Sequence, residues 1–210
     1  MTKSDWDYRG LAAECYDLWF GNEPFWDQAF FHNRIRHNGG EALEIACGTG
    51  RLLVPFLRDG LAVEGLDASA EMLAICRSKA ARVGVTPTLH QQLMQDVDLP
   101  ARYRTVFIPT CSFQILAERD EAFEALRRFY RHLEPGGELL ITLAVPWRGL
   151  PEIANRDRIR TGQFRHLLDR SLDVRPLCDP MSRIRVASCG GRSTQRLRHG
   201  PLGPPDSPPQ

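Results

Sequence analysis

The sequence lacks several features that would place the chain in a special class of proteins. Its 27 basic and 26 acidic residues nearly cancel, so no excess of positive charge favours binding to nucleic acid. No apolar run approaches the roughly 18 residues that suggest a membrane-spanning helix. The first residues contain no apolar segment typical of a secretory signal peptide. We therefore expect a cytoplasmic protein that binds neither nucleic acid nor membrane.

Closely spaced cysteine pairs, which bind zinc or form redox-active disulfides, are also missing. We interpret the six cysteines as reduced thiols and expect no metal site; they are Cys15, Cys47, Cys76, Cys111, Cys178 and Cys189. A chain of 210 residues fits a single domain and is long enough to bury a sizeable core.

Aromatic residues nearly vanish after Trp147, where Phe164 is the sole exception. From Arg148 onward the chain has 12 arginines and only 6 acidic residues, so an acidic body is followed by a basic tail. We expect the tail, residues 148–210, to be largely disordered, because it has too little apolar surface to offset chain ordering. A truncated or frameshifted carboxyl end explains the same composition, and both explanations stay open.

Apolar periodicity predicts helices that alternate with strands up to residue 145. Helices are expected over residues 6–22, 24–36, 51–57, 69–83 and 121–133. Strands are expected over residues 42–46, 62–66, 88–92, 105–109 and 138–145, with a turn at 135–137. This alternation predicts an α/β fold with a parallel sheet. Beyond it, only a weak helix over 160–172 and a weak strand over 184–187 are found.

The most informative segment is the glycine-rich turn that follows the first expected strand. Glu44 interrupts this otherwise apolar strand, and Gly48 and Gly50 follow it. Glycine allows backbone conformations that bring the chain close to a ligand. In open α/β sheets, ligands bind at the carboxyl ends of the strands, beside such turns. Asp67 stands at the expected end of the second strand, so it belongs to the same edge.

A dinucleotide-binding turn does not match this segment well. It requires a third glycine three residues after Gly50, where the chain has Leu53. A pyrophosphate also favours positive or neutral surroundings at the helix start, and Glu44 is negative. The turn therefore favours a ligand with an ammonium and a sulfonium group, and a nicotinamide-dependent oxidoreductase remains a weaker alternative.

Several segments resemble motifs of the class I S-adenosylmethionine-dependent methyltransferases. Residues 44–50, Glu-Ile-Ala-Cys-Gly-Thr-Gly, are similar to the first motif, residues 63–69 to the second, and residues 133–139 to the turn before the fifth strand. Residues 16–19, Tyr-Asp-Leu-Trp, resemble the amino-terminal cap over the cofactor. The resemblance covers about residues 8–147.

The resemblance implies S-adenosylmethionine as cofactor and methyl transfer to a small-molecule acceptor. It implies a Rossmann-like parallel sheet flanked by helices, with a helical cap at residues 1–40 and the core at 41–147. The family ends its sheet with an antiparallel hairpin that this sequence lacks, so the sheet is expected to be incomplete at its carboxyl-terminal edge. An S-adenosylmethionine-binding pseudoenzyme or truncated inactive methyltransferase is the alternative.

The cofactor site implied by the resemblance has ten residues: Tyr16, Glu44, Ala46, Gly48, Gly50, Asp67, Ala68, Met72, Met94 and Asp96. Tyr16 is expected at the lid, Glu44 near the ammonium and Asp67 at the ribose hydroxyls. The adenine is expected to lie near Ala68, Met72, Met94 and Asp96.

Structural alternatives remain for some of these residues. Tyr16 and Met72 could be packing residues, Asp67 could cap the following helix, and Asp96 could be a solvated loop acid. Leu93 stands where relatives usually carry an acid. Thr110, Ser112 and Gln114 are expected near the acceptor, and no catalytic residue is assigned.

Overall fold

The computed structural model describes residues 10–20, 26–144 and 183–189. Its helices are α1 (Leu11–Phe20), α2 (Trp26–Asn38), α3 (Leu53–Arg58), α4 (Ala70–Arg82) and α5 (Arg119–Arg131), with short 3-10 helices η1 (Met94–Asp96) and η2 (Ser112–Ile115). Its strands are β1 (Ala42–Ile45), β2 (Val63–Asp67), β3 (Leu89–Gln91), β4 (Tyr103–Ile108), β5 (Leu133–Ala144) and β6 (Arg183–Cys189).

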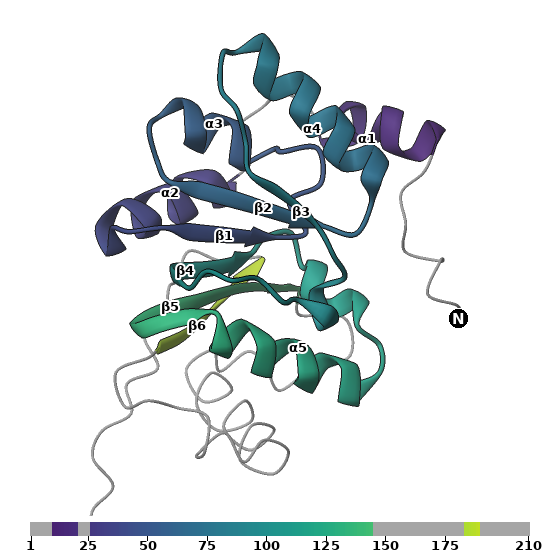
Figure 1. Cartoon of the computed structure of the whole chain (residues 1–210). Coiled ribbons are helices and arrows are strands. Elements are labelled where there is room, and N and C mark those ends of the chain that lie inside the picture. The colour runs from purple at the N-terminus through teal and green to yellow at the C-terminus, as the bar shows by residue number, and fades with distance from the viewer. Residues whose placement is uncertain (1–9, 21–25, 145–182, 190–210) are drawn as a thin grey trace, which may run out of the picture.

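The strands form one sheet in the order β3-β2-β1-β4-β5-β6, and all neighbouring strands are parallel. The chain builds outward from β1 to β3 and then returns to the other side of β1 with β4 (Figure 1). The strand order reverses between β1 and β4, and in open α/β sheets ligands bind at the carboxyl ends of the strands beside such a point. The glycine-rich turn therefore lies at the place where open α/β sheets bind ligands.

Helices cover both faces of this sheet, with α2, α3 and α4 on one side and α5 on the other (Figure 1). Successive residues of β1 point to opposite faces, so Ala42 joins the core under α2, α3 and α4, and Leu43 joins the core under α5. All four residues of β1 are buried, as expected for a central parallel strand. Glu44 has the same parity as Ala42 and belongs to the α2 side.

The structure confirms the predicted parallel sheet flanked by helices, and each strand and helix expected between residues 24 and 144 has a counterpart. The fifth strand begins earlier than predicted, at Leu133, where it pairs with Tyr103. The register then shifts between Tyr103 and Thr105, and Gly136 adopts a φ of 75°. The predicted turn at 135–137 is therefore an irregularity inside β5 and does not precede it.

At the carboxyl-terminal edge, the weak strand signal over 184–187 corresponds to β6. This strand pairs in parallel with β5 along its whole length, from Glu138 opposite Arg183 to Ala144 opposite Cys189. The family's antiparallel hairpin was expected to be missing at this edge, and in the described residues a parallel strand, β6, lies there. The predicted helix over 160–172 and the rest of the tail lie outside the described residues.

Candidate functional site

The first two strands end side by side, and a carboxylate joins their ends. The Gly48 amide donates a hydrogen bond to Oδ2 of Asp67 at 2.8 Å, and the Ser69 amide donates to Oδ1 at 2.9 Å. Ser69 itself caps α4 by accepting from the Met72 amide. Asp67 is thus not the cap residue of α4, and its carboxylate holds the glycine-rich turn against the loop that starts α4.

The two glycines of the turn differ in their surroundings. Gly48 and Gly50 have φ values of 54° and 78°, a region that side chains other than glycine's rarely adopt. A Cβ on Gly50 would lie 2.5 Å from Sγ of Cys76 and 2.8 Å from Val54, whereas a Cβ on Gly48 would meet only Met72, at 3.6 Å. Gly50 therefore allows the turn to pack on α4, while a Cβ on Gly48 would make only an ordinary van der Waals contact with Met72.

Glu44 is a buried acid in the middle of β1, with an exposed fraction of 2%. Its Oε2 atom has no hydrogen-bond partner among the described residues. Burial raises the pKa of Glu44 well above its ordinary value; the charge of Arg51 lowers it, and those of Asp27 and Asp67 raise it again. A buried acceptor without a hydrogen-bond partner destabilises the folded chain unless a donor or a cation reaches it.

A buried ion pair lies next to Glu44. Both terminal nitrogens of Arg51 donate to the carboxylate of Asp27 in α2, at 2.8 Å each. The side chain of Asp27 is 1% exposed and that of Arg51 is 15% exposed. The sequence pattern did not predict this pair because its members lie 24 residues apart, although an acid on the apolar face of α2 was a visible signal.

The amino-terminal helix α1 contacts the same turn. Oδ1 of Asp17 accepts a hydrogen bond from the Thr49 hydroxyl at 2.6 Å, and Lys79 of α4 donates to both oxygens of Asp17. Thr49 and Lys79 were not predicted as functional residues. Tyr16, which is partly buried, lies close enough to raise the pKa of Arg51. The predicted cap and the predicted turn are therefore in direct contact.

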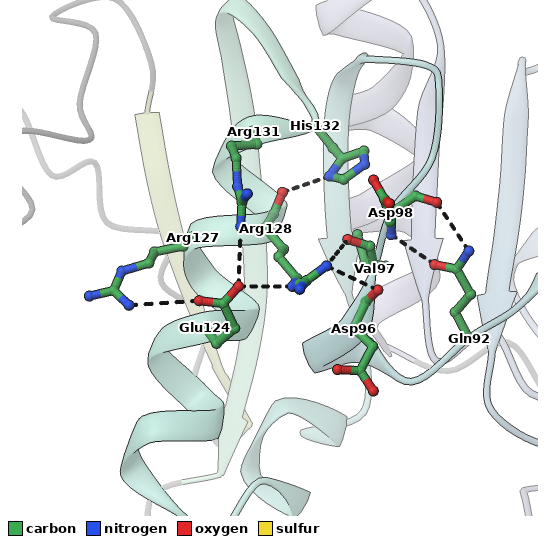
Figure 2. Close-up of polar contacts among 9 residues, drawn as sticks. All are labelled: Gln92, Asp96, Val97, Asp98, Glu124, Arg127, Arg128, Arg131 and His132. Carbon is green, nitrogen blue, oxygen red and sulfur yellow. Dashed lines mark hydrogen bonds and ion pairs between the residues drawn. The ribbon is translucent and has the colours of Figure 1, made fainter.

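The segment that follows β3 is fixed from the α5 side. Arg128 donates to the carbonyl oxygens of Asp96 and Val97 at 3.2 and 3.1 Å, and its Nε donates to Glu124. Figure 2 shows this contact, with the Asp96 carboxylate directed away from Arg128. Met94 packs against the core on the α5 side, and Asp96 is exposed.

Residues 42–137 match the family model described as a methyltransferase domain. This match agrees with the motifs that resemble those of the class I S-adenosylmethionine-dependent methyltransferases. The chain is 35% identical to the dTDP-3-amino-3,6-dideoxy-alpha-D-glucopyranose N,N-dimethyltransferase of Streptomyces fradiae. The aligned part covers 67% of this chain and 55% of that relative.

Solved structures agree with this resemblance. DesVI of Streptomyces venezuelae has a TM-score of 0.53 and 28% identity over 62% of this chain and 56% of DesVI. CalS10, an amino pentose methyltransferase from Micromonospora echinaspora solved with S-adenosylmethionine bound, has a TM-score of 0.52 and 28% identity over 64% of this chain and 56% of CalS10. The chain spans about half the length of the curated relatives it matches, 53–56%.

In the described part of the chain, most of the expected cofactor residues gather around one edge of the sheet. Ala46, Gly48, Gly50, Asp67 and Met72 surround the turn, and Glu44 lies in the strand that leads into it. Met72 is 2% exposed, which fits its alternative as a core residue. Ala68 links β2 to α4, and its carbonyl oxygen accepts from Gln91. Met94 and Asp96 lie in the loop after the neighbouring strand β3.

The end of β4 carries the residues expected near the acceptor. Thr110 and Cys111 adopt φ values of 54° and 62°, an uncommon conformation for residues with a side chain. Such strain clusters at functional sites, and Ala46, which follows the neighbouring strand β1, also has a positive φ, of 57°. Ser112 and Gln114 follow in η2.

The described part of the chain contains neither a membrane-spanning helix nor a metal-binding cluster. No helix in it combines the length and apolar character needed to cross a membrane. No group of three or more His, Cys, Asp or Glu side chains in it is arranged to hold a metal ion.

Proposed function

We propose that this chain binds S-adenosylmethionine at the carboxyl edge of β1 and β2 and transfers a methyl group to a small-molecule acceptor in the cytoplasm. The observation that carries the proposal is the hydrogen bond between the Gly48 amide and the Asp67 carboxylate, beside the buried Oε2 of Glu44. An acceptor pair for a diol, an open backbone and a buried anion suit a cationic adenosyl ligand.

Each group in this site has a physical role toward that ligand. A carboxylate has about four acceptor sites, so the bonds that Asp67 accepts from two amides do not exclude the ribose hydroxyls. Gly48 lets the backbone approach the methionyl part closely. Oε2 of Glu44 gains a partner when an ammonium group enters, which offsets the cost of its burial.

S-adenosylmethionine supplies a methyl group that is already activated by its sulfonium. The chain therefore mainly has to position the cofactor and the acceptor and to exclude water. Alignment of two reactants is worth roughly 7–11 kcal/mol of the barrier in favourable cases. The contact between Asp17 and Thr49 holds the cap helix over the turn, and the core of residues 41–147 supplies the rigid frame. The loop of Thr110, Ser112 and Gln114 borders the space for the acceptor.

Amino sugars are the first acceptors to test, because two relatives at 35% and 30% identity are named as dTDP-amino-sugar N,N-dimethyltransferases. An unprotonated amine carries its own lone pair, so its attack on the sulfonium methyl needs no strong general base, and its proton leaves to solvent.

The test is transfer of labelled methyl from S-adenosylmethionine to a panel of amino sugars and other small amines and phenols. Label in any acceptor supports the proposal. Calorimetric binding of the cofactor without transfer to any acceptor would favour the pseudoenzyme, and absence of binding would contradict both. The oxidoreductase alternative predicts that NAD raises the melting temperature, and we expect no such rise.

A further inference from the structure

We infer that the buried pair of Asp27 and Arg51 is a positioning device that keeps the Glu44 carboxylate available to the ammonium group of the cofactor. The inference rests on the proposed function and extends it to two residues outside the predicted site. It starts from the charges that surround Glu44, which are Asp27 on α2, Asp67 on β2 and Arg51 just before α3. The thiols of Cys47 and Cys76 also lie near Glu44, and burial raises the pKa of Cys76 to about 12.

Two carboxylates, those of Asp27 and Glu44, therefore lie close enough to Arg51 to compete for its guanidinium. Arg51 gives both terminal nitrogens to Asp27 in a two-point contact, at 2.8 Å for each bond. Two-point contacts between arginine and carboxylate are the strong form of this interaction. Asp27 thus holds these two donors, and Oε2 of Glu44 has no hydrogen-bond partner in the described part of the chain.

Without Asp27, the guanidinium would turn to the neighbouring acid. Arg51 and Glu44 already affect each other's pKa: burial lowers the pKa of Arg51, and its bonding to Asp27 and the charge of Glu44 raise it. A guanidinium bonded to Glu44 would have to be displaced before an ammonium group could bind there. The Asp27–Arg51 pair thus determines whether the site accepts a ligand with a free amino-acid end.

The experiment compares three ligands with the full-length chain. S-adenosylmethionine and S-adenosylhomocysteine carry the ammonium group, whereas 5′-methylthioadenosine has the same adenosine and lacks it. In Asp27→Asn, the amide can accept from only one nitrogen of Arg51. We expect the affinity for the first two ligands to fall about tenfold or more, while the affinity for 5′-methylthioadenosine stays within about twofold of wild type.

A double variant, Asp27→Asn with Arg51→Met, separates positioning from a merely structural role. It removes the competing cation together with its partner, so we expect the preference for S-adenosylhomocysteine over 5′-methylthioadenosine to return. It also keeps the test decisive if the single variant does not fold. Glu138→Gln is the matched control, because it breaks another buried arginine–carboxylate pair of α2, with Arg34, at the opposite end of the sheet. That control should leave the ligand preference unchanged.

Equal losses for all three ligands in Asp27→Asn, or no loss at all, would overturn the inference. So would a double variant that lacks the preference for S-adenosylhomocysteine. A wild-type chain that binds none of the three ligands would instead overturn the proposed function, and the inference with it.

Discussion

At the scale of single residues, Glu44 has two separable effects: its burial lowers the stability of the cofactor-free chain, and its carboxylate is proposed to bind the cofactor. The pKa of this buried carboxyl is raised well above the ordinary 4.5, mainly by burial. The folded chain therefore binds its proton more tightly than the unfolded chain does. The contribution of Glu44 to the free energy of unfolding of the cofactor-free chain is therefore highest below about pH 4.5. This contribution falls as the pH rises toward the raised pKa.

Glu44→Gln should separate stability from binding. Removal of the charge should raise the free energy of unfolding of the cofactor-free protein at neutral pH by about 1–3 kcal/mol, the cost of an unsatisfied buried group. The same change should weaken S-adenosylmethionine binding, because the ammonium loses its anion. Urea unfolding and calorimetry measure the two quantities. A variant that is less stable at neutral pH, or that binds as tightly as wild type, would contradict this role.

Gly50 tests the packing of the turn. Gly50→Ala forces a Cβ against Cys76 and Val54 at a φ of 78°, whereas Gly84→Ala places one at a φ of 76° with no atom within 4 Å. Both variants should suffer the left-handed strain of about 1–2 kcal/mol. Gly50→Ala should lose about 1–3 kcal/mol more, from overpacking. Denaturant unfolding compares the two, and equal losses would show that packing at Gly50 is unimportant.

At the scale of elements, the cap helix α1 is tied to the turn by side chains that are partly exposed. Asp17 and Lys79 are 35% and 30% exposed, so their ion pair should contribute only about 0.2–1 kcal/mol to global stability. Asp17→Asn should therefore change the melting temperature little. It should instead speed hydrogen exchange in α1 and weaken cofactor binding a few-fold.

Hydrogen exchange followed by mass spectrometry measures this effect. Glu124→Gln serves as the control, because it removes an acid of similar exposure that pairs with Arg128 and Arg131 on α5. Exchange in α1 should be unchanged in that variant. If Asp17→Asn also leaves α1 exchange unchanged, the contact with Thr49 does not hold the cap.

The elements themselves were largely predictable from sequence, and their side-chain partners were not. Glu44 was visible because a charge stands out within an apolar strand, and the turn because glycines follow it. The partners of Asp17, by contrast, lie 32 and 62 residues away along the chain. Such pairs depend on how helices pack on the sheet, and periodicity does not specify that packing.

At the scale of the whole molecule, the sheet is extended beyond β5 by a strand that lies far along the chain. β6 was difficult to predict from the sequence, because arginine and small residues surround it. Only residues 184–187 had a pattern that indicates a strand. The parallel pairing of β5 with β6 covers the edge of a strand whose middle is buried. We propose that the tail, residues 148–210, therefore contributes to the sheet through this one segment.

Proline at position 186 tests that contribution. Val186 pairs with Ile141, and proline cannot donate a hydrogen bond to a sheet. Val186→Pro should lower the melting temperature and promote self-association through the uncovered β5 edge, measured by light scattering. A chain that ends after Cys189 should behave like wild type. Unchanged stability in Val186→Pro would show that β6 does not support the sheet.

The joint role of Gly48 and Asp67 in binding the cofactor is tested most directly by calorimetric titration of S-adenosylhomocysteine into wild type and Asp67→Ala. The control is Glu41→Ala, which removes an exposed acid at the opposite end of β1. Wild type and the control should bind equally well, and Asp67→Ala should lose about 1–3 kcal/mol of binding free energy. Equal affinity in all three proteins, or no binding to wild type, would contradict the assignment.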